Sequence, residues 1–397
     1  MAEVRRRRRK KREKAGESFF DYTLLFVVLF LILFGLIVIY SVSSYEAGIK
    51  FGDGAYYLKN QLKATGLGMI VFVFTIFFDY HIWEKFALYI YGASIIIVLL
   101  ILTPLGRTYN GARRWLDIGG ISVQPVEIVK VALIIFLAAV ITRAGMGIKK
   151  VSSIFKIFSL AIVPALMILL ITRNLSSAII LMGIAAVMLY MADPRYMRYM
   201  GLAVLGALLV MLILFAITNH YEKNEGTGDF RSARIIAWLH PEDYAEDVSF
   251  QTIQGMYAIG SGGVFGKGLG ESVQKMKLPE AQNDMVFTII CEELGVFGGL
   301  CVMALFLVMI YRCMVIASNA PDTYGALLVT GVMGHFALQV ILNIAVVTNT
   351  IPNTGVTLPF ISYGGTSVMF LLAETGLVLN VSRNIRMKEG VVYEGRA

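Results

Sequence analysis

Cysteine and charge are both scarce in this 397-residue chain, and each shortage excludes classes of protein. The three cysteines, Cys291, Cys301 and Cys313, include no Cys-x-x-Cys pair, so neither a disulfide framework nor a zinc site is supported. Charged residues make up 16% of the chain and hydrophobic residues 57%. In ordinary soluble domains about 25% of residues are charged and about 45–50% are apolar. The chain is therefore not a soluble, disordered, collagen-like or disulfide-stabilised protein.

The excess of positive charge, +8 overall, is concentrated at the N-terminus. Nine of the ten residues from Arg5 to Lys14 are arginine or lysine, and the remainder is nearly balanced. A basic block directly before a long apolar run is typical of a cytoplasmic membrane anchor. We therefore expect no nucleic-acid partner, and we interpret residues 1–18 as a basic cytoplasmic tail.

Long apolar runs account for most of the chain. A helix needs about 20 apolar residues to cross a hydrocarbon core of ~30 Å. This criterion predicts an all-α polytopic membrane protein with about ten transmembrane helices. The first run is too long for the apolar core of a signal peptide, so we expect it to be retained. The expected spans are 19–44, 62–78, 84–104, 125–143, 156–172, 175–192, 197–218, 285–311, 323–348 and 360–382.

The charges of the connections predict the orientation, because cytoplasmic loops carry more lysine and arginine. With the N-terminus inside, the inner loops and the tail 383–397 are basic. The longest connection, 219–284, then lies outside between helices 7 and 8, and it holds ten acids and six bases. The membrane domain 19–382 thus has both ends in the cytoplasm. The inner loops are short, so any chemistry must occur in the membrane or at its outer face.

The outer loop is long, and long connections without secondary structure are usually functional. Its residues 231–239 indicate a short amphipathic helix on the bilayer surface. Gly260–Gly270 contains six glycines in eleven residues but matches neither a Walker loop nor a dinucleotide motif. Two interpretations of this glycine-rich segment stay open: a flexible turn, or a backbone cradle for an anionic ligand.

Ionisable residues inside a predicted span need a partner or a purpose, since each costs about 2.5–3.5 kcal/mol at the helix centre. Glu127 and Lys130 are three residues apart and share a face, which suits a structural ion pair or a substrate contact. Of Glu292 and Glu293, we expect one to cap a buried network. Glu374 lies deep in the last span, where pairing or packing is expected.

Two further polar features lie near the predicted helix ends. His335, Gln339 and Asn343 recur every four residues and predict a stripe of interhelical hydrogen bonds. Asp284 ends the outer loop. It suits either the N-cap of the eighth helix or a functional carboxylate at the membrane surface.

Arg113 and Arg114 are adjacent, lie beside Trp115, and precede the fourth span on the predicted outer side. Guanidinium groups bind phosphate oxygens bidentately. Lipid phosphates and a bound pyrophosphate are both suitable ligands. Positive charge on the translocated side opposes the orientation rule, which favours a functional role.

Four motifs then occur in order along the chain. They are Gly111-Ala-Arg-Arg-Trp115 with Gln124-Pro-Val-Glu-Ile-Val-Lys130, Tyr257–Ser272, Pro279–Gly295, and Thr354–Ser367. Together, over residues 20–388, they resemble the SEDS family (shape, elongation, division and sporulation), which includes FtsW, RodA and SpoVE. The chain looks closer to FtsW and SpoVE than to RodA. It departs from the family pattern at Val126, at Asn283, and at residues 173–177, which lack the acid common in relatives.

The resemblance implies a C-type glycosyltransferase fold and a peptidoglycan glycosyltransferase. Such an enzyme polymerises lipid II into β-1,4 glycan strands at the outer face of the bacterial plasma membrane, for cell division, elongation or sporulation. A lipid II flippase is the alternative. The implied partners are lipid II, a class B penicillin-binding transpeptidase and single-pass division regulators.

The resemblance also implies roles for Asp284 and for the pair Glu127 and Lys130, while Arg113, Arg114 and Lys267 are expected to bind because a leaving pyrophosphate needs positive charge. The family's essential aspartate corresponds to Asp284, the catalytic base. The expected substrate-binding residues are Arg113, Arg114, Glu127, Lys130 and Lys267. No metal ligands are assigned from the sequence, and a divalent cation, Mg²⁺ or Mn²⁺, is left open as a participant.

Overall fold

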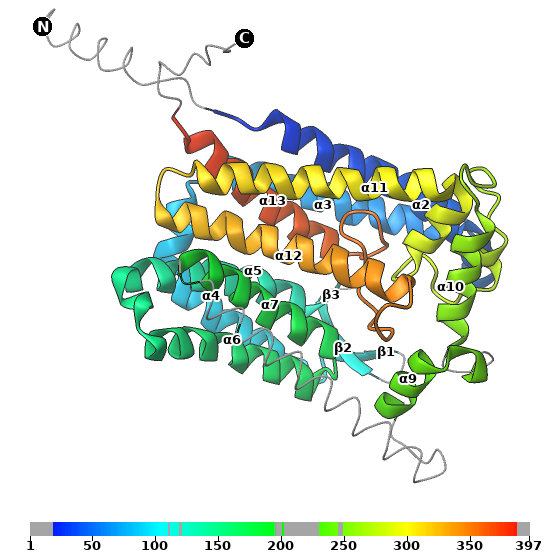
Figure 1. Cartoon of the computed structure of the whole chain (residues 1–397), viewed down its shortest axis with the longest axis horizontal. Coiled ribbons are helices and arrows are strands. Elements are labelled where there is room, and N and C mark those ends of the chain that lie inside the picture. The colour runs from blue at the N-terminus through cyan, green and yellow to red at the C-terminus, as the bar shows by residue number, and fades with distance from the viewer. Residues whose placement is uncertain are drawn as a thin grey trace, which may run out of the picture.

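The computed structural model describes residues 19–109, 112–118, 121–193, 195, 201, 230–244 and 249–386. This part of the chain is mainly helical (Figure 1). The α-helices are α2 (Tyr22–Phe51), α3 (Tyr56–Phe77), α4 (Tyr80–Leu100), α5 (Pro125–Ala144), α6 (Val151–Ile171), α7 (Leu175–Ala192), α9 (Phe230–Leu239), α10 (Phe250–Ser261), α11 (Val286–Ser318), α12 (Thr323–Val347) and α13 (Ser367–Asn384). Short 3-10 turns occur at Gly145–Lys149, Pro241–Tyr244 and Gln274–Met276.

Eight of the described helices are long and apolar enough to cross a membrane. They correspond to eight of the ten expected spans. The expected span 197–218 lies outside the described residues, apart from residue 201. The expected span 360–382 corresponds to α13, which begins later because residues 348–366 form an irregular segment. The count of ten therefore stays a prediction, whereas a multi-pass membrane protein is confirmed.

The helices form one bundle with α5 at its centre. Most residues of α5 are buried, and it packs against α4, α7 and α12. By contrast, α2 carries large apolar side chains such as Phe26 and Phe30 on an exposed face. A helix that is apolar on all sides is expected to face either a core or lipid. The outward faces therefore fit a hydrocarbon environment.

The two ends of the described chain meet at one end of the bundle, which we call the terminal end. The amide of Phe19 donates to the carbonyl of Ile385 over 3.0 Å. The carboxylate of Asp21 accepts two hydrogen bonds from Arg312 Nε, at 3.1 and 2.9 Å. The opposite end carries the sheet, α9 and α10 (Figure 1), and we call it the site end.

A small antiparallel sheet at the site end was not expected from the sequence. Its strands are β1 (Gly106–Tyr109), β2 (Ala112–Ile118) and β3 (Ile121–Val123), in the order β1-β2-β3. Leu116 is buried beneath it, and Arg107 pairs with Asp117 across β1 and β2. Because β3 leads directly into α5, the sheet fixes the entry to the central helix.

The glycine-rich segment is a fixed joint rather than a flexible turn. The amides of Lys267 and Gly268 donate to the carbonyls of Glu292 and Glu293, at 3.0 and 2.9 Å. At Gly295, where φ is 72° and α11 is kinked, a Cβ atom would lie 2.2 Å from the carbonyl oxygen of Val264. Only glycine permits this approach of two backbones. These bonded amides are not available to an anionic ligand.

The amphipathic helix expected at 231–239 is present as α9. Its Ile236 and Ala237 are buried, and the indole of Trp238 donates to the carbonyl of Asn349 over 3.0 Å. The apolar face of α9 thus packs on the protein instead of lying on a bilayer surface.

Candidate active site

Asp284 lies between the glycine-rich joint and α11, at the site end of the bundle. Its Oδ1 accepts a hydrogen bond of 3.1 Å from the Gln251 amide of α10. Its backbone carbonyl accepts one of 2.8 Å from Asn343 Nδ2 of α12. The helix begins at Val286 with Met285 as its N-cap, and no side chain caps it. The N-cap interpretation of Asp284 is therefore wrong, and the carboxylate is left for another role.

Burial raises the pKa of Asp284 to about 6, with a further rise from the negative charge of Glu280. The backbone amide of Asp284 itself, the hydrogen bond from Gln251 and the positive charge of Arg234 lower the pKa in the opposite direction. A general base works best when its pKa lies near the operating pH. A pKa of about 6 is therefore compatible with proton transfer near neutrality.

Two arginines from distant segments are linked to this carboxylate through their charges. Arg234 of α9 is close enough to Asp284 for its charge to lower the pKa of that group. Arg114 of β2 is within reach of the charge of Arg234, which acts with burial to lower the pKa of Arg114. Arg114 donates to the carbonyls of Thr172 and Arg173, at 3.1 and 3.3 Å, which holds β2 against the end of α6.

Arg234 was not among the residues expected from the sequence. Arg234 Nη1 donates to the backbone carbonyl of Asn353 over 3.4 Å, and Asn353 lies in the segment between α12 and α13. An arginine in an amphipathic helix of the outer loop carries no motif of its own. Only the packing of α9 brings it beside the carboxylate.

Arg113 points away from this site. Its Nε donates to the carbonyl of Gly106 over 3.1 Å, and its Nη2 donates to the carbonyl of Thr103. The adjacent arginines therefore separate, because successive side chains of a strand point to opposite faces. A pyrophosphate contact by Arg113 stays a prediction, and its observed bonds hold the loop before β1.

Glu127 and Lys130 form the ion pair that one of the two interpretations expected. Lys130 Nζ lies 2.8 Å from Glu127 Oε1, and both side chains are buried. Among the described residues, neither has a hydrogen bond or ion pair to Asp284. The pairing is confirmed, and a substrate contact by either residue stays a prediction.

Lys267 lies at the glycine-rich joint. Its Nζ is 2.7 Å from Glu292 Oε1 and 2.9 Å from the hydroxyl of Ser261. Glu292 also accepts from the backbone amides of Val273 and Gln274, at 3.2 and 3.3 Å. Glu292 is thus the acid that caps a buried network. The contribution of Lys267 to substrate binding stays a prediction, and its observed partner is structural.

The remaining polar residues join elements inside the bundle. The hydroxyl of Ser41 on α2 donates to the Glu293 carboxylate and lies 2.8 Å from each of its two oxygens. His335 Nδ1 lies 2.8 Å from Glu374 Oε2, so the expected pairing of Glu374 is confirmed. Gln339 Nε2 donates to the carbonyl of Thr357 over 3.0 Å. The polar side chains of α12 therefore bind both α13, through His335, and the irregular segment before α13, through Gln339.

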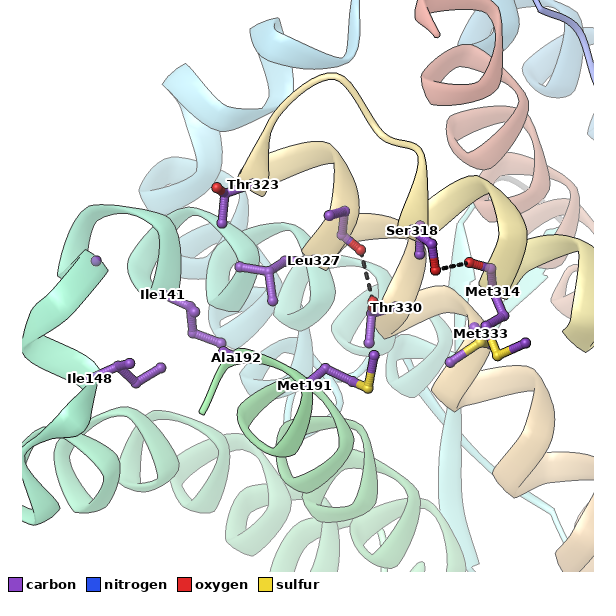
Figure 2. A pocket seen from close by; sticks show the side chains of 13 residues that line it. Ile141, Ile148, Met191, Ala192, Met314, Ser318, Thr323, Leu327, Thr330 and Met333 are labelled. Carbon is purple, nitrogen blue, oxygen red and sulfur yellow. Dashed lines mark hydrogen bonds between the residues drawn. The ribbon is translucent and has the colours of Figure 1, made fainter. Parts of the chain in front are cut away.

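A separate hollow lies at the terminal end, between the ends of α5, α7 and α11 and the start of α12 (Figure 2). Its volume is about 320 Å³, and no titratable side chain lines it. Thr323, Thr330 and Ser318 supply its few hydroxyl groups. It therefore offers no acid or base, and the candidate chemistry stays at Asp284.

No three histidine, cysteine, aspartate or glutamate side chains of the described residues gather as a metal site. The bundle of long apolar helices defines the class of protein. It is a multi-pass membrane protein with a carboxylate and arginine side chains at one end of its helices. The chain belongs to the FtsW/RodA/SpoVE family of cell cycle proteins, whose family model matches residues 22–387.

Curated relatives and solved structures match almost the whole chain. Stage V sporulation protein E of Bacillus subtilis is 37% identical over 372 residues, covering 92% of this chain and 98% of its own. A probable peptidoglycan glycosyltransferase FtsW of Trichlorobacter lovleyi is 35% identical, and the match covers 93% of this chain and 94% of that protein.

Two solved structures share the fold. A chain of a peptidoglycan synthase complex described as coordinating polymerization and crosslinking has a TM-score of 0.76 and 25% identity, covering 92% and 98% of the two chains. The rod shape determining protein RodA of Thermus thermophilus has a TM-score of 0.65 and 26% identity, covering 93% and 98%.

Proposed function

We propose that this protein is an inverting peptidoglycan glycosyltransferase that polymerises lipid II into β-1,4 glycan strands at the outer face of the plasma membrane. The observation that carries the proposal is the Asp284 carboxylate, held at the end of the bundle beside Arg234 and near Arg114. The names of the matched relatives support the same activity. They do not favour the alternative of a lipid II flippase.

The reaction joins two membrane-tethered sugars in one displacement. The 4-hydroxyl of an acceptor sugar attacks the anomeric carbon of the donor, and the bond to polyprenyl pyrophosphate breaks. An α-linked donor that gives a β product requires inversion, so a single base is sufficient. Asp284 accepts the hydroxyl proton as the new carbon–oxygen bond forms. General base catalysis contributes about 10²–10⁴ in rate.

The leaving pyrophosphate needs positive charge, and Arg114 and Arg234 supply it beside the base. Guanidinium groups suit this role because they stay protonated and bind phosphate oxygens in pairs. The sequence alone directed attention to Arg113 and Arg114. The arrangement favours Arg114 with Arg234 over Arg113, because the charge of Arg234 acts on both Arg114 and Asp284, whereas Arg113 is directed at the loop before β1. A divalent cation stays open as a further participant, and no step depends on it here.

The partners and the orientation belong to the same proposal. A class B penicillin-binding transpeptidase would crosslink the new strand, in division, elongation or sporulation, and single-pass division regulators would bind the complex. The similarity to a chain of a peptidoglycan synthase complex supports such an assembly. Both chain termini would lie in the cytoplasm, as the basic residues at the N-terminus indicate.

The test is direct. The purified chain, alone and with its transpeptidase, is supplied with lipid II in detergent, and the products are separated on a gel. We expect polymer that a muramidase degrades. If neither preparation forms polymer while the same protein moves labelled lipid II across a vesicle membrane, transport replaces polymerisation as its function.

A further inference from the structure

The Gln251 side chain joins the proposed catalytic base to a distant part of the chain. Its Nε2 donates to Asp284 Oδ1 over 3.1 Å, and its Oε1 accepts from Asn353 Nδ2 over 3.0 Å. We infer that Gln251 is a positioning residue for the Asp284 carboxylate, and that Asn353 sets the direction of the Gln251 amide. This inference rests on the proposed role of Asp284 as base.

The donors and acceptors in this series of hydrogen bonds are determined by the backbone amide of Gly355. The backbone amide of Gly355 donates to Asn353 Oδ1 over 3.0 Å, and a backbone amide can only donate. Asn353 must therefore turn its NH₂ group towards Gln251. Gln251 must in turn accept with its oxygen and present its own NH₂ group to Asp284. Neither amide can flip without placing two acceptors or two donors against each other.

The consequence for the carboxylate is that its two oxygens differ. Oδ1 is held by Gln251, whereas no other residue in the described part of the chain donates a hydrogen bond to Oδ2. The Cα atom of Gly355 faces Oδ2, and a Cβ atom there would lie 3.7 Å from it with no other atom within 4 Å. Gly355 therefore leaves room for about one carbon atom on the side of Oδ2. Oδ2 is the oxygen placed to accept the proton of the acceptor hydroxyl.

The three segments involved are far apart in sequence and are tied to one another by other bonds. Asn343 holds the backbone of Asp284 and also donates to the carbonyl of Val356 over 2.7 Å. Ser176 of α7 donates to the carbonyl of Thr354. The segment that carries Asn353 is therefore anchored directly after this residue. It can fix the amide of Gln251 without moving.

Loss of the Gln251 donor has a defined effect on the titration of the base. The charged groups that act on Asp284 are Glu280 from its own loop and Arg234 from α9. Their contributions stay when Gln251 is replaced. Removal of one hydrogen bond to the ionised carboxylate raises its pKa, so the acid limb of the pH–rate profile moves to higher pH.

The test compares Gln251→Met with Gln254→Met, a matched change one turn further along α10 at a glutamine that has no hydrogen bond in the described part of the chain. For Gln251→Met we expect polymerisation at saturating lipid II to fall about tenfold. KM should stay within about twofold, and the acid limb should rise by about one pH unit. Gln254→Met should match the parent. A normal rate and an unmoved limb in Gln251→Met, or equal losses in both variants, would overturn the inference.

Asn353→Asp is the second variant, because it keeps the acceptor for Gly355 and removes only the donor to Gln251. The new carboxylate then competes with Asp284 for the NH₂ group of Gln251 and adds a negative charge, so we expect a loss at least as large as in Gln251→Met. In the Gln251→Met background the same change should have a clearly smaller effect, which reports its added charge alone. Equal effects in both backgrounds would contradict a relay through Gln251.

Asp284→Asn is measured beside these variants to separate this inference from the proposed function. Polymer formed by Asp284→Asn at the parent rate would remove Asp284 as base, and the positioning role with it. An inactive Asp284→Asn together with a normal Gln251→Met would leave the base in place and reject only the positioning role.

Discussion

Arg114 and Arg234 differ from Arg113 because the charge of Arg234 acts on Arg114 and on Asp284, whereas Arg113 binds the loop before β1. For Arg114→Gln and Arg234→Gln we expect kcat/KM for lipid II to fall about tenfold or more each, chiefly through KM, because each loses charge-assisted bonds to phosphate oxygens. Initial rates across a lipid II titration measure this. Arg113→Gln is the comparison, and there we expect a lower Tm and an unchanged KM. If Arg113→Gln raised KM and Arg114→Gln did not, the assignment of the pyrophosphate site would be reversed.

The buried pair of Glu127 and Lys130 allows a second prediction for single residues. Lys130→Met leaves an uncompensated carboxylate inside the bundle, which costs about 3–5 kcal/mol. Glu127→Gln combined with Lys130→Met removes both charges, so the double variant should unfold at a higher temperature than Lys130→Met alone. Thermal unfolding in detergent of the parent, both single variants and the double variant completes the cycle. Strictly additive losses would show that the two side chains do not stabilise one another.

The joint between the glycine-rich segment and α11 is the feature of the fold most sensitive to a single methyl group. Gly295→Ala would place a Cβ atom against the carbonyl of Val264 and force a residue with a side chain to a φ of 72°. We expect a loss of at least about 2 kcal/mol in stability, seen as a lower Tm. Gly260→Ala on α10 is the control, since nothing lies within 4 Å of its added atom. A fall in Tm of the same size in Gly295→Ala and Gly260→Ala would contradict a structural role for the joint.

The sequence predicted the membrane-crossing elements well and the irregular ones poorly. Runs of about 20 apolar residues locate helices because the hydrocarbon thickness demands that length. No comparable rule applies to β1–β3 or to the segment 348–366, whose conformation depends on partners such as Gln61, which accepts from Gly364 and Gly365 at 3.4 and 3.2 Å. The glycine-rich joint also needed the structure, because its amides bind carbonyls of α11 that lie more than twenty residues away.

The candidate site could be predicted from the sequence only in part, for the same reason. Asp284 was identified because it lies within a recognisable motif at the start of a helix. Gln251, Asn353 and Arg234 lie on other segments, and an isolated glutamine, asparagine or arginine has no sequence signature. Only tertiary packing shows that Gln251 binds the carboxylate of Asp284, that Asn353 binds Gln251, and that the charge of Arg234 acts on the same carboxylate.

The arrangement of the whole molecule predicts a topology. The ends of the described chain meet at the terminal end, and Asp284 lies at the opposite end. A single cysteine placed at Glu271, in a background lacking the exposed Cys301, should react with a membrane-impermeant maleimide added to intact cells. A cysteine at Arg386 should react only after the membrane is opened. Labelling of Arg386→Cys but not of Glu271→Cys in intact cells would invert the topology and remove the site from the outer face.

The central claim is that Asp284 is the base of a glycan polymerase. Asp284→Asn keeps the shape and the hydrogen-bonding capacity of the side chain but removes the basic carboxylate, so folded yield should equal that of the parent. With purified protein, its transpeptidase partner and lipid II, the amount of glycan polymer on a gel should fall by at least about 10², the lower range for a general base. Equal amounts of polymer from the parent and from Asp284→Asn would contradict the account.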